Sequence, residues 1–113
     1  PSAMNQVFMN ILANALDALE QTREPTIEIV TRSVEKEGAT WVCVEISDNG
    51  PGISEATQAH LFEPLFTTKP VDKGTGLGLS ISREIVEQKH SGQLTCESTL
   101  GRGCRFVVML PAG

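Results

Sequence analysis

The sequence has no apolar run of the length that a membrane-spanning helix needs, and it has no visible signal peptide. Positive charge is scarce: 9 lysines and arginines stand against 14 aspartates and glutamates. The resulting net charge of −5 argues against a general nucleic-acid binder and against a polybasic membrane-surface patch. Cysteine is scarce too. The 3 cysteines are an odd number without metal-ligand spacing, so we expect reduced thiols in a cytosolic compartment rather than a redox-active group.

What is present is a chain of ordinary globular composition, and its 113 residues suffice for one domain with a buried core. It opens at Pro1 and Ser2 without an initiator methionine, so we expect an excised or processed piece of a longer protein. The length predicts that residues 1–113 belong to one domain.

Apolar spacing predicts the order of the elements. The first helix carries apolar side chains at helical spacing: Val7, Phe8, Ile11, Leu12, Ala15, Leu16 and Leu19. The predicted elements are a helix at 4–20, strands at 26–35 and 41–47, a short helix capped by Ser54 and reaching about 62, a long mobile loop at 64–76, a helix at 77–89, and strands at 93–98 and 104–110. Antiparallel hairpins with helices on one face predict an α+β fold, a two-layer sandwich with a mixed, mostly antiparallel sheet.

A second stripe on the first helix is polar. Asn10, Asn14 and Asp17 follow one another at intervals of one turn, so they share one face. Amide and carboxylate oxygens suit a hard cation such as Mg²⁺, which keeps several waters and takes few protein ligands. A solvated polar face explains the same pattern.

The segment from Asp48 to Ile53 follows a strand and contains Gly50 and Gly52. Glycine lets a backbone turn sharply and approach a ligand closely, and an acidic group at a strand end can accept a hydrogen bond from an exocyclic amine. Asp-Asn-Gly is also strong turn chemistry by itself, so an ordinary strand-ending turn remains an alternative.

A glycine-rich segment, Gly74 to Leu79, opens the helix predicted at 77–89. Small residues there expose backbone N–H groups at a helix N-terminus, which favours an anion. Lys69 and Lys73 precede it, so the pattern indicates phosphate, with a flexible hinge as the alternative. The spacing matches neither the dinucleotide-binding glycine motif nor a P-loop.

Together these segments resemble the histidine-kinase ATPase domain, which has the Bergerat ATP-binding fold. Residues 10–18 resemble its N box, 48–52 its G1 box, 61–69 its F box, 74–81 its G2 box and 101–111 its closing hairpin. The order of the five matches the family. The family usually has strand material ahead of the N box, so the resemblance implies a domain incomplete at its N-terminus, without the dimerisation domain that bears the phosphoacceptor histidine.

The resemblance implies a site for ATP and Mg²⁺ between the first helix and the loop 64–76, the ATP lid. Asn14 would bind the metal, Asn10 and Asn14 would be the catalytic residues, and Asp48 would accept from the adenine amino group. The remaining residues implied for nucleotide binding are Asp17, Gly50, Gly52, Ile53, Phe66, Lys69, Lys73, Gly74, Thr75, Gly76, Leu77, Gly78, Leu79 and Cys104. The family often has threonine at the position of Cys104.

The implied function is the catalytic domain of a two-component sensor histidine kinase, which transfers the γ-phosphoryl group of ATP to a histidine on the dimerisation domain of the same protein. The implied partners are that domain and, indirectly, a response-regulator receiver domain, in a homodimeric parent that is cytoplasmic or anchored in the inner membrane. His60 and His90 lack the sequence context of the acceptor.

Three alternatives within and beyond this fold remain. Hydrolases and conformational-switch ATPases of the superfamily use a glutamate where this chain has Asn10, and an amide cannot act as a base. A serine-kinase anti-sigma factor shares the fold, although Thr67, Thr68 and Lys69 favour the sensor kinase. The last alternative is a module that binds nucleotide weakly or not at all.

Overall fold

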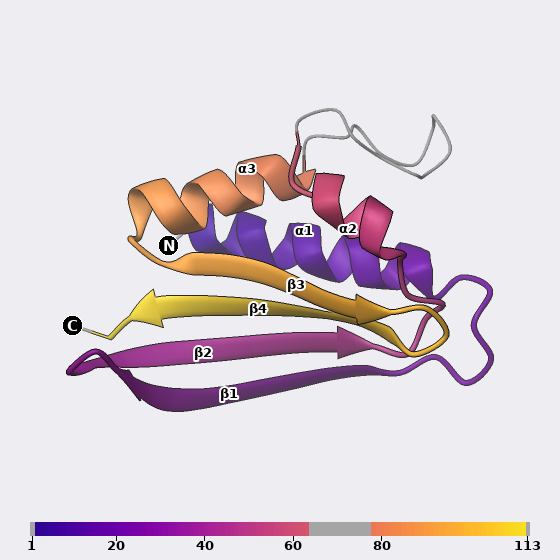
Figure 1. Ribbon diagram of the computed structural model, residues 1–113, viewed down its shortest axis with the longest axis horizontal. Helices are drawn as coiled ribbons and strands as arrows, with labels where there is room; N and C mark the ends of the chain where they lie inside the picture. The colour runs from indigo at the N-terminus through magenta and orange to yellow at the C-terminus, as the bar shows by residue number, and fades with distance from the viewer. Residues whose placement is uncertain (1, 64–77, 113) are drawn as a thin grey trace.

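The computed structural model describes residues 2–63 and 78–112, and Figure 1 shows them as a sheet with helices over one face. The helices are α1 (Ser2–Ala18), α2 (Glu55–His60) and α3 (Gly78–Glu84). Helix α3 continues as a π-helical segment, η1 (Ile85–Lys89). The strands are β1 (Ile27–Lys36), β2 (Ala39–Asp48), β3 (Gln93–Thr99) and β4 (Gly103–Pro111). The four described strands are all antiparallel, in the order β1-β2-β4-β3. The predicted α+β two-layer sandwich is confirmed.

Helix α1 lies on the sheet along a narrow stripe. The buried residues of this stripe are Met4, Val7, Ile11 and Ala15, and Leu19 continues the spacing of three or four positions just after the helix ends. Leu16, one of the seven apolar residues at helical spacing, lies outside this stripe and is 61% exposed. Leu16 follows the stripe residue Ala15 by one position, and one position turns a helix by about 100°, so the side chain points away from the sheet.

The core lies between the helices and the inner face of the sheet. Val7 and Ile11 of α1, Val86 of η1, Leu94 of β3 and Val108 of β4 are all inaccessible to solvent. Residues at every second position of a strand share a face, so Leu94 and Val108 contribute to the core from adjacent strands at one register position. No described helix has the length and hydrophobicity to cross a membrane.

Local signals place the turns and the helix ends. Glu37 and Gly38, with φ of 54° and 77°, form the two-residue turn of the β1–β2 hairpin, and positive φ at both positions matches the right-handed twist of the strands. Ser54 caps α2 as predicted, since its Oγ accepts from the Thr57 N–H at 3.2 Å. The predicted helix 77–89 is divided between α3 and η1.

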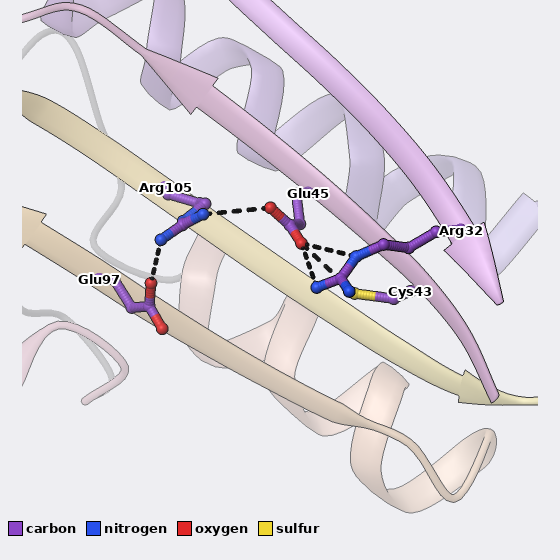
Figure 2. Close-up of polar contacts among 5 residues, drawn as sticks. All are labelled: Arg32, Cys43, Glu45, Glu97 and Arg105. Atoms are coloured by element: carbon purple, nitrogen blue, oxygen red, sulfur yellow. Dashed lines mark hydrogen bonds and ion pairs between the residues drawn. The ribbon is translucent and has the colours of Figure 1, made fainter. Parts of the chain in front are cut away.

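The outer face of the sheet carries a row of charges that crosses all four strands (Figure 2). Glu45 of β2 accepts from Arg32 of β1, with Nη2 to Oε2 at 2.7 Å, and from Arg105 of β4, with Nη1 to Oε1 at 3.2 Å. Arg105 also donates to Glu97 of β3 at 2.6 Å. The hydrogen bond from Arg32 is the main cause that lowers the pKa of Glu45. The row stabilises the strand order electrostatically.

Candidate functional site

Asp48 ends β2 on the inner face of the sheet, and it is only 9% exposed. Its backbone neighbours in the sheet are Ile27 of β1 and Cys104 of β4. The carboxylate Oδ1 accepts from the Gly50 N–H at 2.9 Å, and no ion pair to it is present within residues 2–63 and 78–112. Burial raises the pKa of Asp48, and backbone hydrogen bonds from Gly50 and Cys104 offset only part of that effect. A buried carboxylate that is only partly satisfied by backbone N–H groups can accept a hydrogen bond from a donor group of a ligand.

The loop after Asp48 is fixed to the β3–β4 hairpin. The Ile53 N–H donates to Ser98 Oγ at 2.9 Å, and the Gly101 N–H donates to the Pro51 carbonyl at 2.7 Å. Gly52 has φ of 75°, and a Cβ there would collide with the Thr99 carbonyl. Glycine at this position is therefore required by packing within the protein, whereas contact with a base stays a prediction.

Two further glycines, Gly50 and Gly103, lie close to Asp48. A Cβ at Gly50 would lie 3.1 Å from both the Ala18 carbonyl oxygen and Asp48 Oδ1, so this glycine fits against the last turn of α1. Gly103 has φ of 98°, and a Cβ there would overlap the Asp48 carbonyl. Both glycines allow close packing around Asp48.

Asn10 connects α1 to the first turn of α3. Its Nδ2 donates to the Gly78 carbonyl at 3.2 Å and to Ser82 Oγ at 3.0 Å, and Ser82 Oγ donates to the same carbonyl at 2.8 Å. Ser82 is inaccessible to solvent. The structure thus brings together the predicted polar face of α1 and the end of the glycine-rich segment, through a contact that sequence reasoning did not identify.

The other predicted residues of α1 are half-buried: Asn14 and Asp17 lie one and two turns after Asn10. An amide and a carboxylate oxygen on one half-buried face are a donor set that fits Mg²⁺, which takes few protein ligands. Leu79 packs partly against the core beside Gly78. The remaining predicted residues lie outside the described part of the chain: Phe66, Lys69, Lys73, Gly74, Thr75, Gly76 and Leu77.

An open cavity of about 500 Å³ lies at the Asp48 end of the sheet. Besides Asp48 and Cys104, the residues that line it include Gln58, Cys96 and Ser98, which sequence reasoning did not single out, and two cations, Arg102 and Arg105. Ser98 Oγ donates to the Gly103 carbonyl at 2.7 Å, and Gln58 Nε2 donates to the Ser98 carbonyl at 2.9 Å. The alternation of β3 was the available signal, because Cys96 and Ser98 share a face with the core residue Leu94. A cavity beside a buried carboxylate that has no ion-pair partner among the described residues fits a base that carries an amino group.

Comparison with known proteins identifies this α/β sandwich as an ATPase domain. Residues 1–113 match the family described as histidine kinase-, DNA gyrase B-, and HSP90-like ATPase, and the chain belongs to this family. The predicted resemblance is thereby confirmed.

The similar proteins are sensor kinases. The chain is 42% identical over 113 residues to the two-component sensor PprA of Pseudomonas aeruginosa, covering 96% of this chain and 12% of that protein. It is 38% identical over 109 residues to the sensor protein FixL of Bradyrhizobium diazoefficiens, covering 96% of this chain and 20% of that protein. The chain thus spans a fifth or less of the length of these relatives.

Solved structures also share the fold, and two of them are histidine kinases. The catalytic domain of histidine kinase ThkA superposes with a TM-score of 0.80 at 34% identity, covering 97% of this chain and 66% of that one. The mycobacterial sensor histidine kinase MprB also gives a TM-score of 0.80, at 24% identity, over 97% of this chain and 72% of that one. The family match makes the chain an ATPase domain of this family, and these relatives make it similar to the catalytic domains of sensor histidine kinases.

Proposed function

We propose that this chain binds ATP with Mg²⁺ and presents the γ-phosphoryl group to a histidine on a separate dimerisation domain of the same protein. The observation that carries the proposal is Asp48, a buried carboxylate without an ion-pair partner in the described residues, beside a cavity at the end of β2. The parent protein would be a homodimer that acts in the cytoplasm, and a response-regulator receiver domain would take the phosphoryl group from the histidine.

Asp48 explains a preference for adenine. The adenine amino group donates to a carboxylate, whereas guanine presents a carbonyl oxygen at that position. Two acceptors facing each other leave a buried group unpaired, which costs roughly 1–3 kcal/mol. We therefore infer that the site selects ATP over GTP through Asp48.

The residues of α1 support phosphoryl transfer to a protein acceptor rather than to water. Asn14 would hold Mg²⁺, which would neutralise charge on the phosphates when bound. The Asn10 amide has no useful basicity, and its Nδ2 already donates to Gly78 and Ser82. General-base help to an attacking water contributes typically about 10²–10⁴-fold, so a site without a base should hydrolyse ATP slowly.

Calorimetry with ATP and GTP, each with Mg²⁺ and with a chelator, tests the binding step. The expected result is ATP binding about tenfold or more tighter than GTP binding, and weaker in the chelator. Equal affinities for the two nucleotides would overturn the role given to Asp48.

Phosphorylation of a supplied histidine tests the reaction. A histidine-bearing hairpin from a related kinase, or the native upstream segment, is added and acid-labile phosphohistidine is followed over time. Transfer that requires the hairpin supports the proposal. Rapid phosphate release by the chain alone, abolished by Asp17→Asn, would instead establish a hydrolase.

A further inference from the structure

Two thiols lie in contact beside Asp48. Cys96 Sγ of β3 and Cys104 Sγ of β4 are 3.3 Å apart on the inner face of the sheet. Both line the cavity at the Asp48 end, and both are half-buried free cysteines. Cys104 is paired with Asp48 on one side and with Ser98 on the other. The expectation of reduced thiols without a redox role does not anticipate this contact.

We propose that Cys96 and Cys104 are a redox pair that a hydroperoxide oxidises to a disulfide, and that this disulfide weakens nucleotide binding at Asp48. The second half of the inference rests on the proposed function, whereas formation of the disulfide does not.

The two thiols have different roles in the oxidation. A hydrogen bond from Cys96 lowers the pKa of Cys104, while the same contact together with burial raises the pKa of Cys96. Because the thiolate is the nucleophile, Cys104 attacks first. Its sulfur forms a bond to one oxygen of hydrogen peroxide, and the O–O bond breaks. The other oxygen leaves as hydroxide and takes up the proton that the Cys104 thiol lost, so the products are a Cys104 sulfenic acid and water.

Cys96 completes the reaction. Its sulfur attacks the Cys104 sulfur, the S–O bond breaks, and the hydroxide leaves as water with the Cys96 proton. In sum, two thiols and one hydrogen peroxide give one disulfide and two waters, and the two electrons pass to the peroxide. A thiol reductant reverses the oxidation by thiol–disulfide exchange.

Disulfide formation must move β4 relative to β3. Cys96 is paired with Phe106 and Cys104 with Ser98, so the two cysteines are diagonal rather than opposite. The sulfur atoms must close from 3.3 Å to a bond of about 2.05 Å. Diagonal neighbours are normally farther apart than opposite ones, so the bond pulls the start of β4 toward β3 and is easily reduced.

That movement affects the nucleotide site directly. A backbone hydrogen bond from Cys104 supports the Asp48 carboxylate, and Gly103 lies against the Asp48 carbonyl. Displacing this segment weakens the support of Asp48 and removes a thiol from the cavity. Loss of about one hydrogen bond's contribution predicts an ATP affinity about tenfold lower in the oxidised protein.

Cys43 provides the internal control. It is 2% exposed and lies on the outer face, where its Sγ is 3.9 Å from Glu45 Oε2. Burial on the opposite face keeps it away from both the peroxide and the other two thiols. Cys43→Ser should therefore retain the full response to peroxide.

The experiment treats the chain with limiting hydrogen peroxide, blocks remaining thiols, and digests it with trypsin without reduction. Arg102 lies between the two cysteines, so the disulfide joins two tryptic peptides that a reductant separates. ATP affinity is measured by calorimetry before oxidation, after it, and after reduction, in the original chain and in Cys43→Ser, Cys96→Ser and Cys96→Ala.

The expected result is a linked Cys96–Cys104 peptide and a reversible loss of affinity of about tenfold in the original chain and in Cys43→Ser. In each Cys96 variant, the ATP affinity after peroxide treatment should stay close to the affinity of the same variant before treatment. Absence of the linked peptide would overturn the redox pair, and an equal loss in a folded Cys96 variant would overturn the disulfide as its cause. A reduced chain that binds no ATP would refute the proposed function. The presence or absence of the linked peptide would still show whether Cys96 and Cys104 form a disulfide.

Discussion

Glu45 and Asp48 lie three residues apart on β2, point to opposite faces of the sheet, and have opposite surroundings. Glu45 accepts from two arginines on the neighbouring strands, and its pKa is lowered. Asp48 is buried among backbone groups and thiols, and its pKa is raised. The first carboxylate is stabilised by the fold, whereas the second is destabilised by it. A ligand can stabilise a charge that the fold itself stabilises poorly. This difference makes Glu45 the structural acid and Asp48 the binding acid.

Replacing the binding acid should have the largest effect. Asp48→Asn keeps the shape but removes the charged acceptor, so ATP affinity should fall about 10- to 100-fold, because a hydrogen bond to a charged group contributes roughly 1.5–3 kcal/mol. The melting temperature at pH 7 should stay the same or rise, because the variant no longer buries a charge. Calorimetry and thermal unfolding measure both. A large loss of stability with unchanged affinity would make Asp48 a structural residue.

The pH dependence should separate the two carboxylates. The folded-state pKa of Asp48 is above its ordinary 3.8, so its cost to stability is present at neutral pH and disappears as the pH falls toward 3.8. The folded-state pKa of Glu45 is below 4.5, so its contribution to stability is present above pH 4.5 and is lost as the pH falls through that lower pKa. The two residues therefore act in opposite directions.

Nucleotide binding gives the readout for this prediction. Since binding requires the ionised form of Asp48, the affinity ratio of the original chain to Asp48→Asn should shrink as the pH falls through the raised pKa of Asp48. The same ratio for Glu45→Gln should stay constant. Affinity ratios that fall together for both variants would indicate acid unfolding instead of titration of Asp48.

Periodicity and local turn chemistry predicted most of the fold. The stripe of α1, the cap at Ser54 and both hairpins follow from short-range patterns. Apolar spacing does not separate the exposed Leu16 from its buried neighbours, because seven apolar positions make a wider stripe than the sheet covers. The π-helical segment η1 was not predicted, because apolar spacing gave one continuous helix over 77–89.

The site was predicted less completely, because its contacts join distant segments. Sequence reasoning selected Asp48 and Asn10, but the hydrogen bond from Asn10 to Ser82 spans 72 positions. The contact of Cys96 with Cys104 depends on the register of β3 against β4, which fixes a diagonal pair. A shift of one residue would have placed the thiols on opposite faces.

Replacing the structural acid should have the smallest effect, and that effect should fall on stability alone. Glu45→Gln keeps the volume but removes the charge that both Arg32 and Arg105 face. The side chain of Glu45 is 13% exposed, while those of Arg32 and Arg105 are 57% and 48% exposed, so solvent screens the pairs strongly. The melting temperature should therefore fall by only a few degrees in low salt, and the deficit should shrink in 1 M salt, where the screening length is about 3 Å.

ATP affinity should not change, because the row lies on the face opposite Asp48. An affinity loss like that of Asp48→Asn would mean that the outer row positions the site through β2, and the separation of the two carboxylates would no longer hold.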